Sequence, residues 1–540
     1  MRRLRYLLWL GLIAILTTGY FILRSFGLLG MPEQARAREV PRGDQEVAYI
    51  QAATNGASWE RFVAGLQRVQ KKHPNLIVDE SNAFPEQSAA VPEVSLSFPG
   101  VEGKLWIRWY KLTSAAGSQA WVDELSKRET PPLALIGGGS SDRARDLAAA
   151  LEARRNDWHG APPLLLITTA TANAVNYPDD LSPVTEPLTC IYKDLTYRFC
   201  FTNSQMAEAM WEFVWIMDDL RPFTKLYHFL PAGMAQAVAG DLWGSLAMLH
   251  WGALQPQPVM VHIVEWVDDP YSRDLAQQFR NVFTNPDNPP LPRISLSVDY
   301  SVGGFMAPNP SESLAVQSLI DLMPPSSDHR FLLVLPATDK PARRFLRALS
   351  VNAPRDVNNV VVVTGDSISF NTLYRDRHTN WNIQSMPVPI VAFCHQNPVD
   401  WDQAAVMPGA GPQTTGTEEE LLNADIVELL VEAAFRLKPA AGDAPGKKSV
   451  PAPVLIDSAA LLNQEIIRRR ADYFAEDGNR RGGSGEYVIC LRPRIESGRV
   501  RPEATLEVWS RRIPEPGRTS WQRIKKLDLD YAENRRGMAP

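Results

Sequence analysis

The chain has 540 residues, of which 45% are hydrophobic and 22% are charged, and its formal net charge is -5. This length suits roughly two to four globular domains of about 100–200 residues, and the composition provides for a sizeable core. The mildly acidic balance argues against nucleic acid as a partner, and four cysteines without CxxC spacing are too few for a disulfide scaffold.

The cysteines and histidines predict no metal and no cofactor. The eight histidines show no HExxH or other metal-ligand spacing, and the cysteines have no zinc-site spacing. Cys190 and Cys200 could pair in an oxidising compartment or remain buried thiols, and the sequence leaves both alternatives open.

The first thirty residues combine a basic start with an apolar run. Arg2, Arg3 and Arg5 precede residues 6–23, an uncharged run of about 18 residues, which is near the minimum for a helix that spans a bilayer. The run exceeds the usual apolar region of a cleaved signal peptide, although residues 35–37 resemble a cleavage site. We predict an uncleaved signal anchor in residues 1–30, a single transmembrane helix and an extracytoplasmic globular part after the linker 31–45.

Between residues 46 and 219, short apolar runs alternate with amphipathic helical patterns. Strands are expected at 47–50, 105–110, 133–136 and 164–168, and helices at 59–69, 119–129 and 142–153. Strands that alternate with helices predict a parallel sheet covered by helices on both faces. The loops after these strands then lie at one sheet edge, where open α/β sheets bind their ligands.

A second series of the same kind occupies residues 258–400. Strands are expected at 259–264, 294–298, 331–335, 360–363 and 388–393, and helices at 272–283, 311–322 and 341–350. Two such halves predict an α/β protein with two lobes and a cleft between them. The apolar segment 220–257 between the halves has no clear assignment.

The C-terminal quarter is expected to complete both lobes within residues 401–515. Thr417 and Glu420 form a capping box that opens a helix ending near residue 437. Residues 438–453 have the composition of a flexible linker, and the charged residues 516–540 form a tail.

A glycine run beside two serines is the most informative local motif. An apolar strand ends in residues 137–139, which are all glycine, and Ser140 and Ser141 then open a helix. Glycine lets the backbone approach a ligand closely, and the N–H groups of a helix start suit a carboxylate. A plain strand–turn–helix connection with a serine cap is the alternative. The next strand ends in Thr168, Thr169 and Thr171 at the same expected edge.

The ordered series of segments resembles the type I periplasmic solute-binding proteins that serve branched-chain amino acid ABC transporters, a fold shared with receptor ligand-binding regions. The similar segments are IGGGSS, the Thr/Ala-rich loop after the next strand, LTYRFCFTNSQMAEAM, VMVHIVEWVDDPYSRDLAQQF and FLLVLPATDKPARRFLRAL. The similarity covers residues 46–436 in order. It implies a two-lobed, non-enzymatic protein that closes on a small polar, amino-acid-like ligand and delivers it to an ABC permease.

The resemblance also implies a ligand site between the lobes. By position, Ser141 and Thr171 match groups that hold a ligand's carboxylate and amino group in that family, and Asp366 falls near an acid that pairs with the amino group. Trp59 and Tyr271 fall near aromatic residues of the cleft, with core packing as the alternative for each. The full expected set is Ser140, Ser141, Thr169, Thr171, Trp59, Tyr271 and Asp366.

Two other functions remain open on sequence. One is a ligand sensor that acts through a partner protein. The other is an esterase, because Gly365, Asp366 and Ser367 resemble the nucleophile block of GDSL-type enzymes, with His378 or His395 as the base. No DxxH block follows this motif, so we predict that Ser367 is not a catalytic nucleophile.

Overall fold

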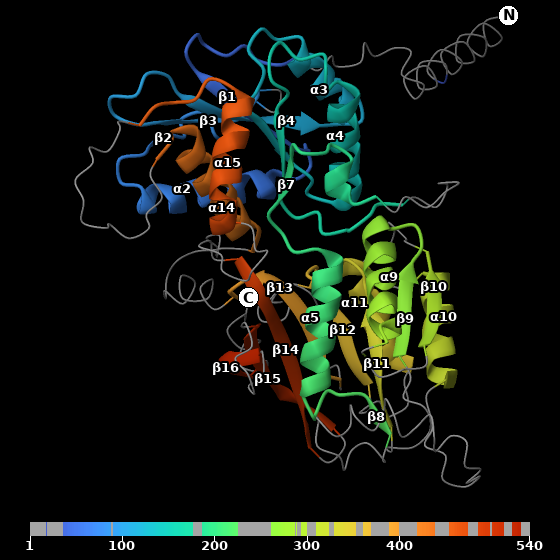
Figure 1. The fold of residues 1–540 in the computed structure, drawn as a ribbon. Helices are drawn as coiled ribbons and strands as arrows, with labels where there is room; N and C mark the ends of the chain where they lie inside the picture. Colours follow the sequence, from blue (N-terminus) through green and yellow to red (C-terminus); the bar gives the residue numbers. More distant parts are fainter. Residues whose placement is uncertain are drawn as a thin grey trace, which may run out of the picture.

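The computed structural model (Figure 1) has two α/β lobes, one built mainly from the N-terminal part of the chain and the other mainly from the C-terminal part. It describes residues 18, 36–87, 90–176, 186–224, 261–286, 288, 293–299, 309–322, 329–352, 360–368, 388–398, 418–437, 453–473, 484–496, 499–511 and 521–530.

The first lobe contains a mixed sheet with the strand order β2-β3-β4-β1-β5-β6-β7. Its strands are β1 (Gln45–Ala52), β2 (Ile77–Asp79), β3 (Glu93–Ser97), β4 (Leu105–Leu112), β5 (Ala134–Gly137), β6 (Leu164–Ile167) and β7 (Thr196–Arg198). Strands β4, β1, β5, β6 and β7 pair in parallel, whereas β2–β3 and β3–β4 pair antiparallel. The prediction of a wholly parallel sheet is therefore wrong at this edge. Among the described residues, no helix lies between β2 and β3 or between β3 and β4, and antiparallel neighbours need no crossover helix.

Helices cover both faces of the first sheet. Helix α2 (Gly56–Lys72) lies on one face with α14 (Glu418–Ala434) and α15 (Ala459–Tyr473), while α3 (Ser118–Ser126) and α4 (Ser141–Ala153) lie on the other. Strand β1 is buried along its whole length, and its alternate side chains enter the two cores because successive strand residues point to opposite faces. A short 3₁₀ helix, Leu188–Cys190, precedes β7.

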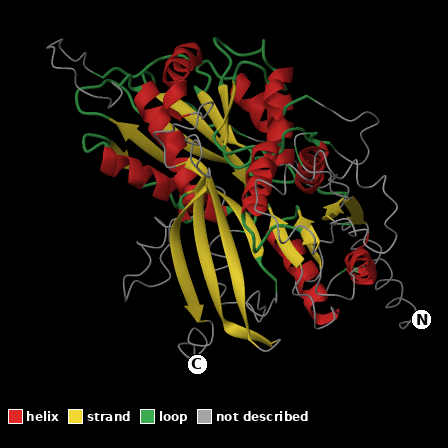
Figure 2. Cartoon of the chain, turned by 60° about the horizontal axis from the view of Figure 1, so that its bottom comes forward, coloured by secondary structure: helices red, strands yellow, loops and turns green. Residues whose placement is uncertain are grey.

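The second lobe has a longer sheet in the order β10-β9-β11-β12-β13-β14-β15-β16, with β8 paired to β11. The strands are β8 (Phe223–Thr224), β9 (Val261–Trp266), β10 (Arg293–Val298), β11 (His329–Leu335), β12 (Val360–Thr364), β13 (Ile390–Gln396), β14 (Ser484–Glu496), β15 (Arg499–Arg511) and β16 (Trp521–Asp530). The sheet is parallel from β10 to β13 and antiparallel from β13 to β16. This sheet too is mixed rather than wholly parallel. Figure 2 shows the long antiparallel strands extending from the rest of the sheet.

Helices α5 (Asn203–Ile216) and α9 (Pro270–Thr284) cover one face of the second sheet, and α10 (Pro310–Leu322) and α11 (Asp339–Asn352) cover the other. The chain passes from the first lobe to the second after β7, through residues 199–202. It returns after β13, because α14 and α15 belong to the core of the first lobe. It reaches the second lobe again at β14.

Several sequence predictions fall wholly or partly outside the described residues. Within those residues, no helix combines the length and the apolar character that a bilayer crossing requires. The predicted anchor lies outside them, except for Thr18, and of the unassigned segment only residues 220–224 are described. Helix α14 begins at Glu418, and Thr417 of the predicted capping box is not among the described residues. Cys190 and Cys200 are free thiols, so the disulfide alternative is not realised.

Candidate functional site

The carboxyl ends of the parallel strands in both lobes face the boundary between them, where the N-terminal part of α4 lies near α9 (Figure 1). Parallel strands present the loops that follow them at one edge, so residues from several loops meet here. Ser140, Thr169, Tyr271 and Asp366 of the predicted site all follow such strands.

The first-lobe wall begins with the turn between β5 and α4. Gly138 has φ 78°, and a Cβ there would lie 2.7 Å from the Ala144 side chain, so this position requires glycine. Ser140 occupies the N-cap position, but its side chain makes no capping hydrogen bond and is partly exposed. Ser141 is buried, and its Oγ accepts a hydrogen bond from the Ala172 N–H at 3.2 Å. The buried serine therefore holds the neighbouring loop, whereas Ser140 remains accessible.

The loop after β6 forms the adjoining part of this wall. The Thr169 hydroxyl is partly exposed and donates to the carbonyl of Gly139 at 3.4 Å. Thr171 is buried, and its carbonyl accepts from the Asn203 N–H at 2.8 Å. Thr169 is thus placed beside Ser140, while Thr171 joins the loop to the start of α5.

Trp59 is buried in the hydrophobic core of the first lobe. Its ring stacks on Phe62 and Trp109, and its indole N–H donates to the Ala83 carbonyl at 2.8 Å. This placement favours the core-packing alternative for Trp59.

The second-lobe wall contains a network that connects Tyr271, Asp366 and His395. The Tyr271 hydroxyl donates to Asp366 Oδ1 at 2.8 Å, and His395 Nε2 lies 3.0 Å from Asp366 Oδ2. His395 Nδ1 accepts from the Phe201 N–H at 3.1 Å, which places the imidazole proton on Nε2 and makes it a donor to Asp366. A Cβ on Gly365 would lie 2.1 Å from the Tyr271 hydroxyl oxygen, so the tyrosine packs directly over glycine.

The charge states of two acids follow from this network. Burial alone would raise the pKa of Asp366, but hydrogen bonds from His395 and Tyr271 and the electrostatic effect of the imidazole hold its pKa below the usual value. Burial raises the pKa of Glu418 to about 7, although the nearby His395 opposes this and the His395 backbone N–H donates to Glu418. Asp366 is therefore an anion at neutral pH, whereas Glu418 gains or loses its proton close to neutral pH.

Asp274 of α9 joins the second lobe to the first-lobe loop after β6 and also contacts the start of α5. Its carboxylate accepts from the backbone N–H groups of Asn173 at 2.8 Å and Ala174 at 3.2 Å, and from the Asn203 side chain at 2.8 Å. Burial raises the pKa of Asp274, and these hydrogen bonds oppose that effect. Asp274 is therefore a latch between α9 and the loop after β6. A sequence pattern could not identify it, because its partners come from distant segments.

A further acid at the boundary is Asp269, the N-cap of α9. Its side chain accepts from the Tyr271 N–H at 3.3 Å. Burial raises its pKa to about 6, and the negative charges of Asp142 and Asp268 add to the rise. Since Asp142 belongs to the first lobe, this repulsion acts across the boundary.

The esterase alternative finds no support in the geometry around Ser367. The Ser367 hydroxyl donates to the Ala337 carbonyl, and both nitrogens of His395 are engaged by Phe201 and Asp366. A serine nucleophile needs a base within hydrogen-bond reach. His378 lies outside the described residues.

We expect a serine-reactive fluorophosphonate to leave the chain unlabelled at Ser367, because none of the described residues is positioned as a base to remove its proton. Mass spectrometry of the treated protein tests this. Covalent labelling that disappears in Ser367→Ala would restore the esterase as a function.

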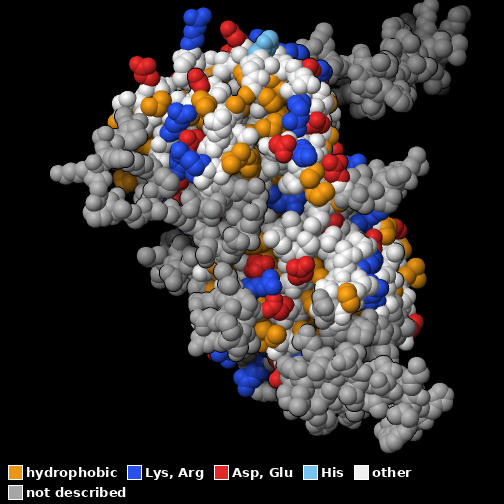
Figure 3. All heavy atoms as spheres, in the orientation of Figure 1, with side chains coloured by type: hydrophobic (Ala, Val, Ile, Leu, Met, Phe, Trp, Pro, Cys, Tyr) orange, Lys and Arg blue, Asp and Glu red, His pale blue; other side chains and the backbone are white. Residues whose placement is uncertain are grey.

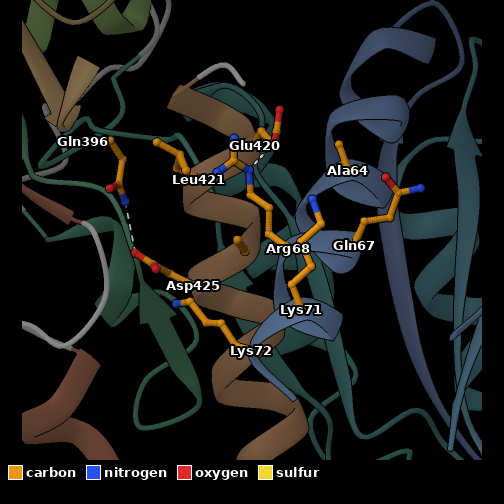
Figure 4. A pocket seen from close by; sticks show the side chains of 10 residues that line it. Ala64, Gln67, Arg68, Lys71, Lys72, Gln396, Glu420, Leu421 and Asp425 are labelled. Carbon is orange, nitrogen blue, oxygen red and sulfur yellow. Dashed lines mark hydrogen bonds and ion pairs between the residues drawn. The ribbon is translucent and has the colours of Figure 1, made fainter. Parts of the chain in front are cut away.

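A separate pocket of about 470 Å³ lies between α2 and α14 (Figure 4). Arg68 reaches Glu420 there, and Gln396 donates to Asp425 at 3.0 Å. On the face shown in Figure 3, Lys and Arg side chains are likewise interspersed with Asp and Glu. Arg68 is paired with Glu420, and Lys72 is paired with Glu428 beside the pocket. We assign no ligand to this pocket.

No protein-family model and no curated protein matches the chain. Among solved structures, it is similar to an ABC transporter substrate-binding protein from Desulfitobacterium hafniense (12% identity, 89% of this chain and 100% of that chain, TM-score 0.41). It is also similar to a solute-binding protein of an ABC transporter from R. palustris in complex with benzoate (13%, 85% and 95%, 0.43). A third is the leucine-, isoleucine-, valine-, threonine- and alanine-binding protein from Brucella ovis in its closed conformation (10%, 92% and 97%, 0.44). These similar structures are of the solute-binding class that the sequence resembles.

Proposed function

We propose that the chain is an extracytoplasmic solute-binding protein, anchored to the membrane by residues 1–30, that binds a small polar ligand between its lobes and delivers it to an ABC permease. The observation that carries the proposal is the placement of polar groups after the strands of both lobes, on the side of each lobe that faces the boundary. Ser140 and Thr169 come from the first lobe, and Tyr271 and Asp366 from the second.

A carboxylate is the ligand group that suits the first-lobe wall. The start of α4 offers the backbone N–H groups of a first helical turn and the positive end of a helix dipole, and Ser140 adds a hydroxyl donor. The Thr169 hydroxyl would donate to the ligand in place of the Gly139 carbonyl. Asp366, with its lowered pKa, suits an ammonium group on the opposite wall. An amino acid carries both groups and is the ligand class that we propose.

Hinge closure is the mechanism that this arrangement supports. The crossing segment after β7 carries Phe201, whose N–H bonds to His395 at the end of β13. This contact lies where the chain passes between the lobes, so a small rotation about it would change the separation of the two walls. Ligand held by both walls would stabilise the closed arrangement.

Calorimetry with variants of the accessible groups tests the ligand site, after a thermal-shift screen of amino acids and other carboxylates has found a ligand. Ser140→Ala and Thr169→Val should each weaken binding about ten- to a hundredfold, because a hydrogen bond to a charged group contributes about 1.5–3 kcal/mol. Asp366→Asn should weaken the binding of amino acids but leave the affinity for ligands that lack an amino group unchanged. Ser141 and Thr171 are less suitable positions, since both are buried and changing them would disturb the loop itself.

Ser313→Ala is the matched control, because Ser313 is an exposed hydroxyl on α10 of the second lobe. The Ser313→Ala variant should bind the ligand with the same affinity as the unaltered protein. If a ligand binds tightly and its affinity is the same in the Ser140, Thr169 and Asp366 variants as in the unaltered protein, the proposed site is wrong.

A further inference from the structure

One group of metal-ligating side chains lies outside the lobe boundary, where α2 ends against α14. His73, the C-cap residue of α2, offers a ring nitrogen, and Glu428 and Glu432 of α14 each offer a carboxylate oxygen. These ligand atoms all lie within 4.8 Å of one another. The close packing of the two helices brings them together, since a Cβ on Gly65 would lie 3.0 Å from the backbone of α14.

The histidine is the informative member of this group. Its Nε2 is buried and has no hydrogen-bond partner among the described residues. A buried polar atom without a hydrogen-bond partner destabilises the fold, so it requires an explanation. Glu428 and Glu432 stand four residues apart on one face of α14, and the negative end of the α2 dipole lies at His73. Each of these features favours a cation at this point.

We propose that His73, Glu428 and Glu432 bind a divalent transition metal ion. One imidazole and two carboxylates are a donor set that suits zinc and neighbouring first-row metals, whereas magnesium and calcium prefer oxygen ligands alone. Three protein ligands leave a fourth tetrahedral position for water. The ion clamps the end of α2 to the middle of α14 and stabilises the first lobe.

Two cationic side chains already pair with the carboxylates, and a metal ion would have to displace them or share the carboxylates with them. Lys72 Nζ lies 2.6 Å from Glu428, and its side chain is 54% exposed, so it can swing into solvent at little cost. The buried Arg469 of α15 lies 3.1 Å from Glu432. A carboxylate has two oxygens, so Glu432 can keep Arg469 on one and hold the metal with the other. Metal binding therefore competes with Lys72 and leaves Arg469 in place.

Thermal unfolding and calorimetry of the full chain, first stripped with EDTA and then titrated with Zn²⁺, test the site. We expect Zn²⁺ to raise the Tm and EDTA to reverse the rise. His73→Gln and Glu428→Gln should weaken the zinc response at least about tenfold, since even changes to outer-shell partners of metal ligands cost that much. Lys72→Met should tighten zinc binding, because it removes the competing ammonium while leaving all three ligands.

The control is His159→Gln, which removes an exposed histidine elsewhere in the first lobe. Its zinc response should match that of the unaltered chain. Visible absorption of Co²⁺ in place of Zn²⁺ reports the ligand set directly, even where a variant has lost stability. Zinc binding that is equally strong in His73→Gln and His159→Gln, or that weakens in Lys72→Met, would overturn the proposal.

Discussion

Arg108→Met is expected to lower the free energy of unfolding of the first lobe by about 3–5 kcal/mol, because it leaves two buried carboxylates without their shared cation. The Arg108 side chain is 3% exposed. Its Nη1 lies 2.6 Å from Glu46 and its Nε lies 2.8 Å from Glu93. Glu46 is 0% exposed and keeps only Arg128, at 2.9 Å, as a cationic partner among the described residues when Arg108 is removed.

Urea unfolding followed by tryptophan fluorescence measures this effect. Arg38→Met is the matched control, because Arg38 also pairs with Glu93, at 2.6 Å, but its side chain is 55% exposed. An exposed pair of this kind contributes about 0–1 kcal/mol. If Arg38→Met lowers the free energy of unfolding as much as Arg108→Met does, burial of the ion pair does not set the cost of breaking it.

Asp274→Ala is expected to cost on the order of 3 kcal/mol and to loosen the contact between the lobes. The carboxylate accepts hydrogen bonds from Asn173, Ala174 and Asn203, and a longer one from Gln278 at 3.3 Å. Hydrogen bonds to a charged group contribute about 1.5–3 kcal/mol each without adding in full. Removing it leaves these N–H groups without their partner. We therefore expect the radius of gyration from small-angle scattering to increase.

Hydrogen exchange gives a local measurement of the same change. The amides of Asn173 and Ala174 should exchange faster in Asp274→Ala, while those in strand β6 should keep their protection. Gln277→Ala on the exposed side of α9 is the control and should leave both properties unchanged. If Asp274→Ala loses stability without any change in scattering or in exchange at Asn173 and Ala174, Asp274 is not a latch between the lobes.

The alternation of strands and helices predicted two α/β lobes, and the described elements form two such sheets with helices on both faces. The parallel pairing was predicted correctly only in part. Strand β3 was not predicted from the sequence, and β4, predicted at residues 105–110, was expected to follow directly on a helix. Gly100 and Gly103 have positive φ in the turn between these strands. Such glycines indicate a hairpin, and hairpin strands pair antiparallel.

The sequence by itself determined what depends on neighbouring residues: the periodicity of strands and helices, and the polar loops at the ends of the strands. The requirement for glycine at Gly138 became visible only in the structure, through its positive φ and the nearby Ala144 side chain. Only the tertiary structure decided which of those loop residues stay accessible. Ser141 and Thr171 became buried supports, while Ser140 and Thr169 remained at the surface of the boundary. The latch at Asp274 and the grouping of His73 with Glu428 bring together segments far apart in the chain. Packing creates such pairs, so no local pattern of residue types could encode them.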